Sequence, residues 1–338
     1  MNIREAIEKL VNRVDLTEEE TIAVMNQIMT GEATPLQIAS FLTALRMKGE
    51  TVQEITGAAR VMREKAHRVK VSADCVIDTC GTGGDQKGSF NISTTSAFVV
   101  AGAGITVAKH GNRSVSSRSG SADVLSALGV KIDVPKEKVE ECLEKIGIGF
   151  LFAPLLHEAM KYAVQPRREI GIRTVFNLLG PLTNPAFATH QLIGIYDGNL
   201  TELIAKVLKN LGTLRAMVVH GLEGLDEISL YGPTKVSELR DGQVTTTTLL
   251  PEELGLKRCR LEELYGGSPE ECAAILRGIL RGEKGPKRDV ALINSGAALY
   301  VCGAADSIAA GMRLAAESID SGKAESELEL LIQMTNAS

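Results

Sequence analysis

The chain has 338 residues, of which 44% are hydrophobic and 23% charged, with a formal net charge of -5. This length predicts two domains with a large core, and the composition excludes a largely disordered chain. The negative charge argues against a nucleic-acid partner, and no apolar run reaches the ~18 residues that a membrane span needs.

The beginning of the chain and its cysteines point to the same cell compartment. The first ten residues, MNIREAIEKL, are charged and helical in period, so we expect neither a signal peptide nor a transit peptide. None of the six cysteines forms a C-x-x-C pair, and no nearby histidine completes a zinc pattern. We therefore expect reduced thiols, no membrane contact and a cytoplasmic protein.

The first ~70 residues predict helices only. Hydrophobic residues recur on one helical face at Ile3, Ile7, Leu10, Val11 and Val14. Three capping boxes follow, formed by Thr17 with Glu20, Thr34 with Gln37 and Thr51 with Glu54. Three successive helix starts indicate a small helical bundle.

From residue 73 onward the pattern changes to alternating strands and helices. Residues 76–79 and 105–109 predict buried strands on either side of a helix at about 91–103. Further strands are predicted at 147–152, 192–196 and 215–220. This order predicts a mostly parallel central sheet, so the fold class is α/β with a small helical domain beside it.

Three later segments depart from that alternation. Residues 155–185 combine helical and Gly/Pro-rich sequence, which suggests an insertion that returns to the helical domain. Residues 228–250 look like a meander with a strand at 245–248. The chain from Ser268 onward is predicted to be mostly helix.

A glycine loop follows the first strand. The sequence DTCGTGGD (78–85) leads to Ser89 and then to NIST (91–94) at the start of a helix. Glycines let backbone N–H groups converge on an anion, and a helix N-terminus adds unpaired donors and a positive dipole end. We therefore predict a phosphate-binding loop; the alternative is a plain glycine turn in which Asn91 or Ser93 caps the helix.

A second polar loop, KHGNRSVSS (109–117), follows the next strand, with Ser119 and Ser121 after it. Ligands of open α/β sheets bind beyond the carboxyl ends of strands, so both loops should share one crevice. Lys109 supplies charge, and the serines supply short donors. A solvated serine-rich loop, with Ser119 as a helix cap, is the alternative.

Two charged clusters complete the set. Asp226 and Glu227 follow a buried strand on a glycine-rich turn, which suits a magnesium ion that bridges to phosphate, although exposed acidic turns are common. Arg167 and Arg168, with Arg173, could hold an anionic substrate, or could begin a surface helix paired with Glu169.

Together these segments resemble the anthranilate phosphoribosyltransferase family. The resemblance rests on DTCGTGGD, NIST, KHGNRSVSS, RREIGIRTVFNLLGPLTNP (167–185) and GLDE (224–227). It implies transfer of a phosphoribosyl group from phosphoribosyl pyrophosphate (PRPP) to the amine of anthranilate. The products are N-(5-phosphoribosyl)anthranilate and pyrophosphate, and this pentosyl transfer belongs to tryptophan biosynthesis. The alternatives are a pyrimidine-nucleoside phosphorylase of the same fold and a catalytically silent nucleotide-binding relative.

The resemblance also implies the architecture. A small helical domain is expected from residues 1–72 and about 160–185, and a large α/β domain from 73–159 and 186–338. The enzyme is expected to be a homodimer that uses Mg²⁺.

The resemblance further assigns the site. It implies anthranilate contacts at Gly81, Asn112 and Arg167, and magnesium ligands at Ser93, Asp226 and Glu227. Lys109 and Asn112 are implied to be catalytic, with His110 as a possible base. The implied PRPP contacts are Gly81, Gly84, Asp85, Ser89, Asn91, Ile92, Ser93, Thr94, Lys109, His110, Gly111, Asn112, Arg113, Ser114, Val115, Ser116, Ser117 and Ser121.

Overall fold

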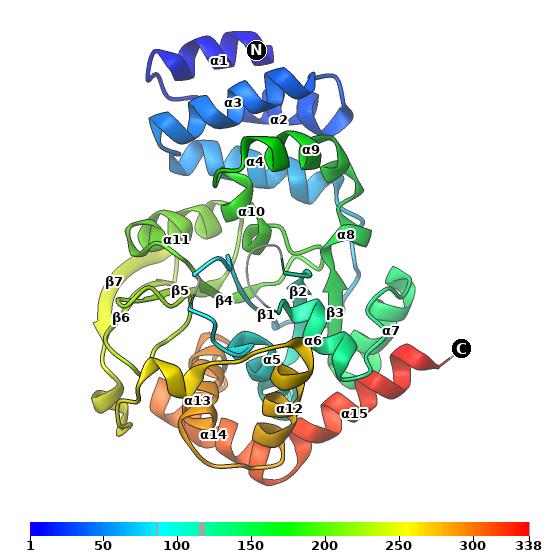
Figure 1. Cartoon of the computed structure of the whole chain (residues 1–338), viewed down its shortest axis with the longest axis vertical. Helices are drawn as coiled ribbons and strands as arrows, with labels where there is room; N and C mark the ends of the chain where they lie inside the picture. Colours follow the sequence, from blue (N-terminus) through cyan, green and yellow to red (C-terminus); the bar gives the residue numbers. More distant parts are fainter. Residues whose placement is uncertain (86, 115–118, 338) are drawn as a thin grey trace.

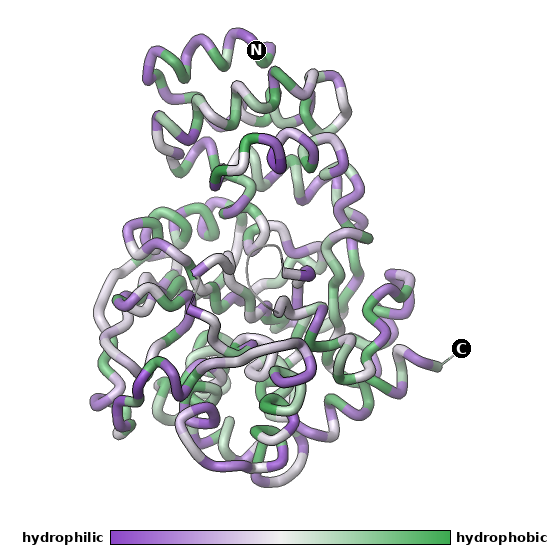
Figure 2. The backbone as a smooth tube through the Cα atoms, in the orientation of Figure 1, coloured by the Kyte–Doolittle hydropathy of each residue, from purple (hydrophilic) through white to green (hydrophobic). Residues whose placement is uncertain are grey.

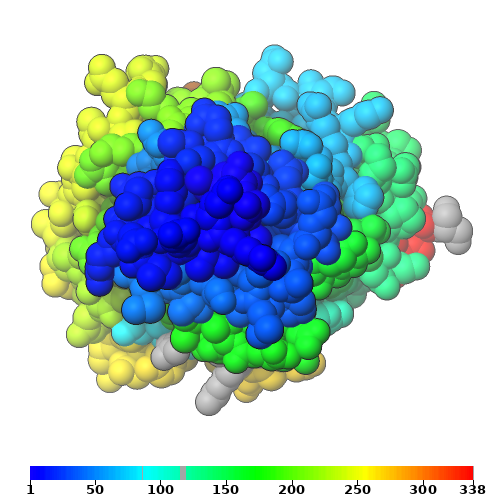
Figure 3. Space-filling model, turned by 90° about the horizontal axis from the view of Figure 1, so that it is seen from above, coloured from blue at the N-terminus to red at the C-terminus, as the bar shows by residue number. Residues whose placement is uncertain are grey.

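The computed structural model of the chain describes residues 1–85, 87–114 and 119–337. A layer of N-terminal helices stands above a seven-stranded sheet that is flanked by further helices (Figure 1). Seen from above, the N-terminal helices form the uppermost layer of the molecule (Figure 3). Among the described residues, no helix combines the length and the apolar character that crossing a membrane requires.

The helical bundle begins as the capping boxes predict. Its helices are α1 (Ile3–Val11), α2 (Glu18–Thr30), α3 (Pro35–Lys48) and α4 (Val52–Lys65). The side chains of Thr17, Thr34 and Thr51 each accept a hydrogen bond from the backbone N–H three residues later. The Glu or Gln side chain at that later position accepts a hydrogen bond from the backbone N–H of the threonine. Figure 2 shows hydrophobic and hydrophilic turns alternating along these helices, as burial of one face requires.

One helical prediction was wrong at its end. The α1 helix stops at Val11, because Arg13 takes a left-handed conformation (φ 58°) and turns the chain. Val11 is 68% exposed and Val14 is 47% exposed, so neither joins the buried face that the hydrophobic period suggested.

The sheet has the order β3-β2-β1-β4-β5-β6-β7, in which the first five strands are parallel to one another, β6 is antiparallel to β5, and β7 is antiparallel to β6. This confirms the mostly parallel sheet predicted from the sequence. The strands are β1 (Val76–Gly81), β2 (Thr106–Gly111), β3 (Ile148–Phe152), β4 (His190–Gly194), β5 (Arg215–Gly221), β6 (Thr234–Arg240) and β7 (Gln243–Leu249).

The remaining helices cover the sheet and connect its strands. Helix α5, which follows β1, and the C-terminal helices pack into one hydrophobic core with the sheet. A second core joins α11, α10 and the opposite face of β4 and β5 to the helical bundle. These helices are α5 (Ile92–Gly102), α6 (Ser121–Ala127), α7 (Lys136–Ile146), α8 (Ala153–Leu156), α9 (Lys161–Ile170), α10 (Phe176–Leu182), α11 (Thr201–Asn210), α12 (Pro269–Leu280), α13 (Pro286–Val301), α14 (Ile308–Asp320) and α15 (Lys323–Asn336).

The segment between β3 and β4 returns to the bundle. Helix α9 packs against α2 and α3, and α10 packs against α4. The Arg63 guanidinium of α4 donates to the carbonyl oxygen of Leu182 at 2.7 Å. We propose from these contacts that the helical domain comprises residues 1–72 and about 160–185, and the α/β domain residues 73–159 and 186–338.

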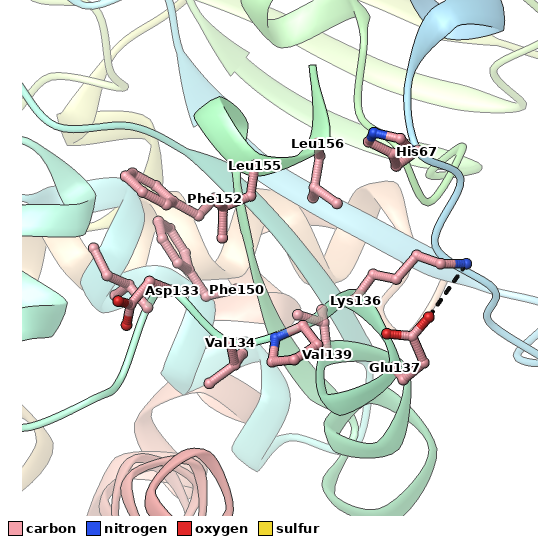
Figure 4. A pocket seen from close by; sticks show the side chains of 12 residues that line it. His67, Asp133, Val134, Lys136, Glu137, Val139, Phe150, Phe152, Leu155 and Leu156 are labelled. Carbon is pink, nitrogen blue, oxygen red and sulfur yellow. Dashed lines mark ion pairs between the residues drawn. The ribbon is translucent and has the colours of Figure 1, made fainter. Parts of the chain in front are cut away.

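The chain segments that link the two parts run side by side. The backbone N–H of His67 donates to the carbonyl oxygen of Leu156 at 2.9 Å, and that of Val69 donates to Pro185 at 3.1 Å. Beside them lies a pocket of about 350 Å³, with Phe150, Phe152 and Leu155 among its lining residues (Figure 4). None of the predicted site residues is among the residues that line it.

Candidate active site

The predicted loops meet at one edge of the sheet. Strands β1, β2, β4 and β5 are parallel and end at Gly81, Gly111, Gly194 and Gly221, so the loops that follow them emerge on the same side. We call the residues 81–85, 89–94, 109–114, 119–121 and 224–227 the carboxyl-edge site. The predicted contacts Val115, Ser116 and Ser117 lie outside the described residues.

The glycine loop contacts the acidic turn directly. The backbone N–H of Gly83 donates to Asp226 Oδ2 at 2.9 Å, and a Cβ on Gly81 would lie 3.0 Å from that same oxygen. Gly83 and Gly84 have φ angles of 63° and 77°, which favour glycine. The loop therefore needs its glycines both for its backbone conformation and for this close approach.

Three carboxylates gather there. The carboxyl groups of Asp85 and Asp226 lie close enough for Asp85 to raise the pKa of Asp226, and Asp85 Oδ2 is buried without a partner among the described residues. Burial is the main cause and the negative charge of Asp85 the second cause of a pKa of about 7 for Asp226. Burial and, to a smaller extent, the negative charge of Asp226 raise the pKa of Glu227 well above its usual range. Lys109 lowers the pKa of Glu227, but its charge does not outweigh burial and the neighbouring carboxylate.

The start of α5 faces this acidic turn. The backbone N–H of Ser93 donates to Glu227 Oε1 at 3.1 Å, and the Thr79 hydroxyl donates to the Ser93 carbonyl oxygen at 3.0 Å. Asn91 precedes the helix, but its side chain makes no capping bond; its Nδ2 donates to the Ser119 carbonyl oxygen at 3.3 Å. The alternative in which Asn91 caps α5 is therefore wrong.

Lys109 lies beneath the loop rather than in it. Its side chain is buried, and its ammonium donates to the carbonyl oxygen of Thr79. Burial lowers the pKa of Lys109, while the charges of Asp78 and Glu227 raise it. In this structure the ammonium thus balances the buried carboxylates and supports the end of β1.

His110 is buried beside a second histidine, His157, with ring centroids 5.2 Å apart. Its Nδ1 lies 3.2 Å from the carbonyl oxygen of Gly180 on α10. Burial and, to a smaller extent, the neighbouring His157 lower the pKa of His110 to about 3. Burial lowers the pKa of His157 to about 4. Both rings are therefore neutral near pH 7.

These two histidines predict a loss of stability in acid. Below pH ~6.5 the unfolded chain binds a proton at each, whereas the folded chain does not until the pH approaches the lowered pKa. The free energy of unfolding should therefore fall as the pH drops from 7 to 5, by roughly 2 kcal/mol per histidine. Chemical denaturation at both pH values should show a smaller fall for His157→Asn than for the original protein; an equal fall would contradict the prediction.

The second loop is held by α6. Asp123 accepts hydrogen bonds from the backbone N–H groups of Ser114 and Gly120, both at 3.0 Å, and pairs with the Arg113 guanidinium at 2.9 Å. The carbonyl oxygen of Asn112 accepts from the Ala122 N–H at 3.2 Å. These bonds leave Asn112 exposed at the end of β2.

The basic cluster divides between two places. Arg167 of α9 is half-buried, with its guanidinium 5.0 Å from the centroid of the Phe176 ring, whereas Arg168 is exposed. Glu169 accepts from Gln165 at 2.8 Å, and Arg167, whose guanidinium lies over the Phe176 ring, has no ion pair among the residues that the structure describes. The alternative that pairs Arg167 with Glu169 is therefore wrong.

Arg173 and Asn184 make contacts at this edge that the sequence did not predict. Arg173 donates to the carbonyl oxygen of Gly84, and its guanidinium lies 4.1 Å from the centroid of the Tyr196 ring. Asn184 donates to Asp78 Oδ2 and to the Ala108 carbonyl oxygen, both at 2.8 Å. Arg173 and Asn184 lie within the 167–185 motif, but the local sequence does not show which distant backbone carbonyl groups their side chains bind.

The carboxyl-edge site also suits a magnesium ion. Asp85, Asp226 and Glu227 offer hard oxygen atoms, and a cation would favour the ionised carboxylates that burial and mutual repulsion disfavour. Among the described residues, no three His, Cys, Asp or Glu side chains form a complete metal-binding group.

Comparison with known proteins covers nearly the whole chain. Residues 4–66 match the "Glycosyl transferase family, helical bundle domain", and residues 73–325 match the "Glycosyl transferase family, a/b domain". The anthranilate phosphoribosyltransferase of Geotalea uraniireducens is 56% identical over 348 residues, covering 99% of each chain. That of Symbiobacterium thermophilum is 58% identical over 322 residues, covering 95% of this chain and 94% of the relative.

Similar solved structures belong to the same family as these relatives. The anthranilate phosphoribosyltransferase of Thermus thermophilus has a TM-score of 0.94 at 46% identity, covering 98% of this chain and 99% of that chain. The Saccharomyces cerevisiae enzyme in complex with PRPP and Mg has a TM-score of 0.90 at 29% identity, covering 98% and 97%. From its motifs, its fold and these likenesses, the chain belongs to the anthranilate phosphoribosyltransferase family.

Proposed function

We propose that the carboxyl-edge site binds PRPP and Mg²⁺, and that Arg167 holds anthranilate against it. The chain is an anthranilate phosphoribosyltransferase, which transfers the phosphoribosyl group of PRPP to the amine of anthranilate in tryptophan biosynthesis. The observation that carries the site assignment is the gathering of Asp85, Asp226 and Glu227 against the glycine loop and the α5 N-terminus.

The pyrophosphate of PRPP is proposed to lie on the glycine loop. Gly84, Asp85 and Ser89 precede the 91–94 segment at the N-terminus of α5, where the positive end of the helix dipole favours an anion. The 109–114 segment and Ser121 form the other side of this site. When bound with PRPP, Mg²⁺ supplies charge stabilisation to the phosphate oxygens, and we propose Ser93, Asp226 and Glu227 as its residues.

The anthranilate side of the site is proposed to include Gly81, Asn112 and Arg167. A planar guanidinium matches a carboxylate through two parallel hydrogen bonds. Arg167 suits this role because it is half-buried and free of a carboxylate partner among the described residues. In the solved structures the Saccharomyces cerevisiae enzyme carries 4-fluoroanthranilate, an analogue of the proposed substrate.

The residues then promote the reaction mainly by positioning. The anthranilate nitrogen forms a bond to C1 of the ribose, pyrophosphate departs with the electrons of the broken bond, and the nitrogen loses one proton. Loop N–H groups stabilise the charge that grows on the pyrophosphate. Lys109 contributes positive charge from beneath the loop. Its ammonium can contact the pyrophosphate only after it gives up its hydrogen bond to the Thr79 carbonyl oxygen.

An aromatic amine is already a usable nucleophile, so the site needs no strong base. His110, with its pKa lowered to about 3, is a poor proton acceptor and is proposed instead to hold the end of β2 to α10. An assay that compares anthranilate plus PRPP with thymidine plus phosphate tests the function. Product from the first pair alone supports it, and product from the second pair would favour a nucleoside phosphorylase.

A matched pair of glycine variants tests the PRPP site. Gly84 and Gly88 both have positive φ, so Gly84→Ala and Gly88→Ala carry similar backbone strain. A Cβ at residue 84 meets Arg173 at 3.2 Å, whereas a Cβ at residue 88 meets nothing within 4 Å. Calorimetry should show PRPP affinity reduced at least about tenfold in Gly84→Ala, or roughly 1.4 kcal/mol, and nearly unchanged in Gly88→Ala. Equal losses in the two variants would refute the loop assignment.

The homodimer is likewise a proposal. Leu36 and Met47 lie on one face of α3 and are 81% and 73% exposed, and Val164 of the neighbouring α9 is also exposed. Exposed apolar side chains on adjacent helices support a contact between two copies of the helical domain. Light scattering that gives the mass of a single chain would contradict it. A cytoplasmic location is proposed from the biosynthetic function.

A further inference from the structure

A second cluster of reactive groups lies at the opposite edge of the sheet from the carboxyl-edge site. Cys75 immediately precedes β1, His190 begins β4, and Arg215 begins β5. The sheet register pairs Ile77 with His190 and His190 with Arg215, so these strand starts are neighbours. Cys302 follows the last residue of α13 and reaches the same place.

The contacts within this cluster are direct. Cys75 Sγ lies 3.5 Å from His190 Nδ1 and 3.9 Å from the carbonyl oxygen of Cys302. The Cys302 side chain also lies near enough to Cys75 to lower the pKa of that thiol. Both cysteines are half-buried and unoxidised, so solvent reaches both residues of the pair.

The charges around the pair favour a thiolate at Cys75. The guanidinium of Arg215 is nearby, and its Nε is buried without a partner among the described residues. The nearby Cys302 side chain and His190 lower the pKa of Cys75 to about 5, although burial opposes them. The nearby Cys75 side chain, together with burial, raises the pKa of Cys302 far above its usual range. The pair thus holds one nucleophilic sulfur and one protonated neighbour.

The other four cysteines, all of them described, have different surroundings. Cys80, Cys142 and Cys272 are buried, and burial raises the pKa of each. Cys259 is half-buried, and burial raises its pKa to about 11. Cys75 and Cys259 are both half-buried, so exposure does not explain why only the pKa of Cys75 is lowered; the groups around Cys75 do.

We propose that Cys75 and Cys302 are a peroxide-reactive thiol pair that closes reversibly into a disulfide. The Cys75 thiolate attacks one oxygen of hydrogen peroxide and breaks the O–O bond, which gives a sulfenic acid and, after protonation, water. The Cys302 sulfur then attacks the Cys75 sulfur, its proton leaves with the hydroxyl group as a second water, and the disulfide forms. Two thiols are oxidised, one peroxide is reduced, and a small thiol reverses the step by exchange.

The disulfide would alter stability rather than the transfer reaction. It would join positions 227 residues apart, and so restrict the unfolded chain. It would also lie at the amino edge of the sheet, away from the carboxyl-edge site. We therefore expect the oxidised protein to melt at a higher temperature, and the reduced Cys302→Ser variant to keep its transferase activity.

Mass spectrometry of the full chain tests the pair. The reduced protein is treated with an equimolar amount of hydrogen peroxide, alkylated and digested. We expect a peptide linked through Cys75 and Cys302, with the loss of two hydrogens, before any other cysteine is oxidised; dithiothreitol should reverse it. Cys302→Ser should instead trap a sulfenic acid at Cys75 that reacts with a 1,3-diketone probe.

Two controls complete the experiment. Cys259→Ser should leave the 75–302 linkage unchanged, because Cys259 is a half-buried cysteine outside the cluster. At pH 6, iodoacetamide should modify Cys75 at least about tenfold faster than Cys259, since the thiolate is the reacting form. Oxidation that begins at another cysteine, or at Cys75 without linkage to Cys302, would overturn the proposal. An unchanged melting temperature in the linked protein would overturn its effect on stability.

Discussion

The double variant Asp226→Asn, Glu227→Gln is expected to lower turnover by at least about 100-fold and to shift magnesium dependence to higher concentration. Asp226 contacts the glycine loop, and Glu227 contacts the start of α5, so both lie where the leaving pyrophosphate is proposed to bind. Removing two negative charges would weaken the hold on a cation that carboxylates and phosphates share. Initial rates measured across a magnesium titration give both quantities.

This variant should still fold. Burial already raises the pKa of both carboxyl groups, so the folded chain tolerates their neutral forms, and the amides have nearly the same volume. Glu223→Gln is the matched control: it lies on the same turn, but its carboxylate accepts a hydrogen bond from the Ser229 hydroxyl. If the double variant kept nearly the original rate at every magnesium concentration, Asp226 and Glu227 would not be magnesium ligands, and their turn would be an ordinary acidic turn.

Arg167→Ala is expected to raise the KM for anthranilate at least about 30-fold, while PRPP affinity changes little. Losing one partner of a desolvated charged contact costs roughly 2–5 kcal/mol, and the lower figure corresponds to that ratio. Burial lowers the pKa of Arg167, which shows that its guanidinium is partly withdrawn from water before any substrate binds. Steady-state kinetics with each substrate varied in turn separate the two effects.

Arg168→Ala provides the control, since Arg168 is the next residue on α9 but is exposed. We expect its KM for anthranilate to stay within a few-fold of the original value. If the two variants behaved alike, a general effect of positive charge on α9 would explain both, and Arg167 would lose its assigned contact.

Local sequence determined the helical bundle and the existence of the glycine loop. A capping box such as that of Thr17 and Glu20 closes within four residues, so its hydrogen bonds form wherever the chain goes next. The positive φ angles of Gly83 and Gly84 are equally local, because only glycine adopts them without strain. Hydrophobic period alone failed at Val14, where the left-handed Arg13 turned the chain out of the helix.

Tertiary structure decided which distant residues meet. Because β4 lies between β1 and β5, Gly194 passes beside Asp226: a Cβ there would lie 1.6 Å from the Asp226 carbonyl oxygen, a contact that only glycine permits. The burial of Lys109 and the approach of Cys75 to Cys302 likewise depend on strand order. Such contacts join residues far apart in the chain through the packing of whole elements, whereas sequence patterns report only neighbours. The sequence by itself thus determined the elements and the chemistry they carry, and the packing of the sheet determined which charges and thiols face one another.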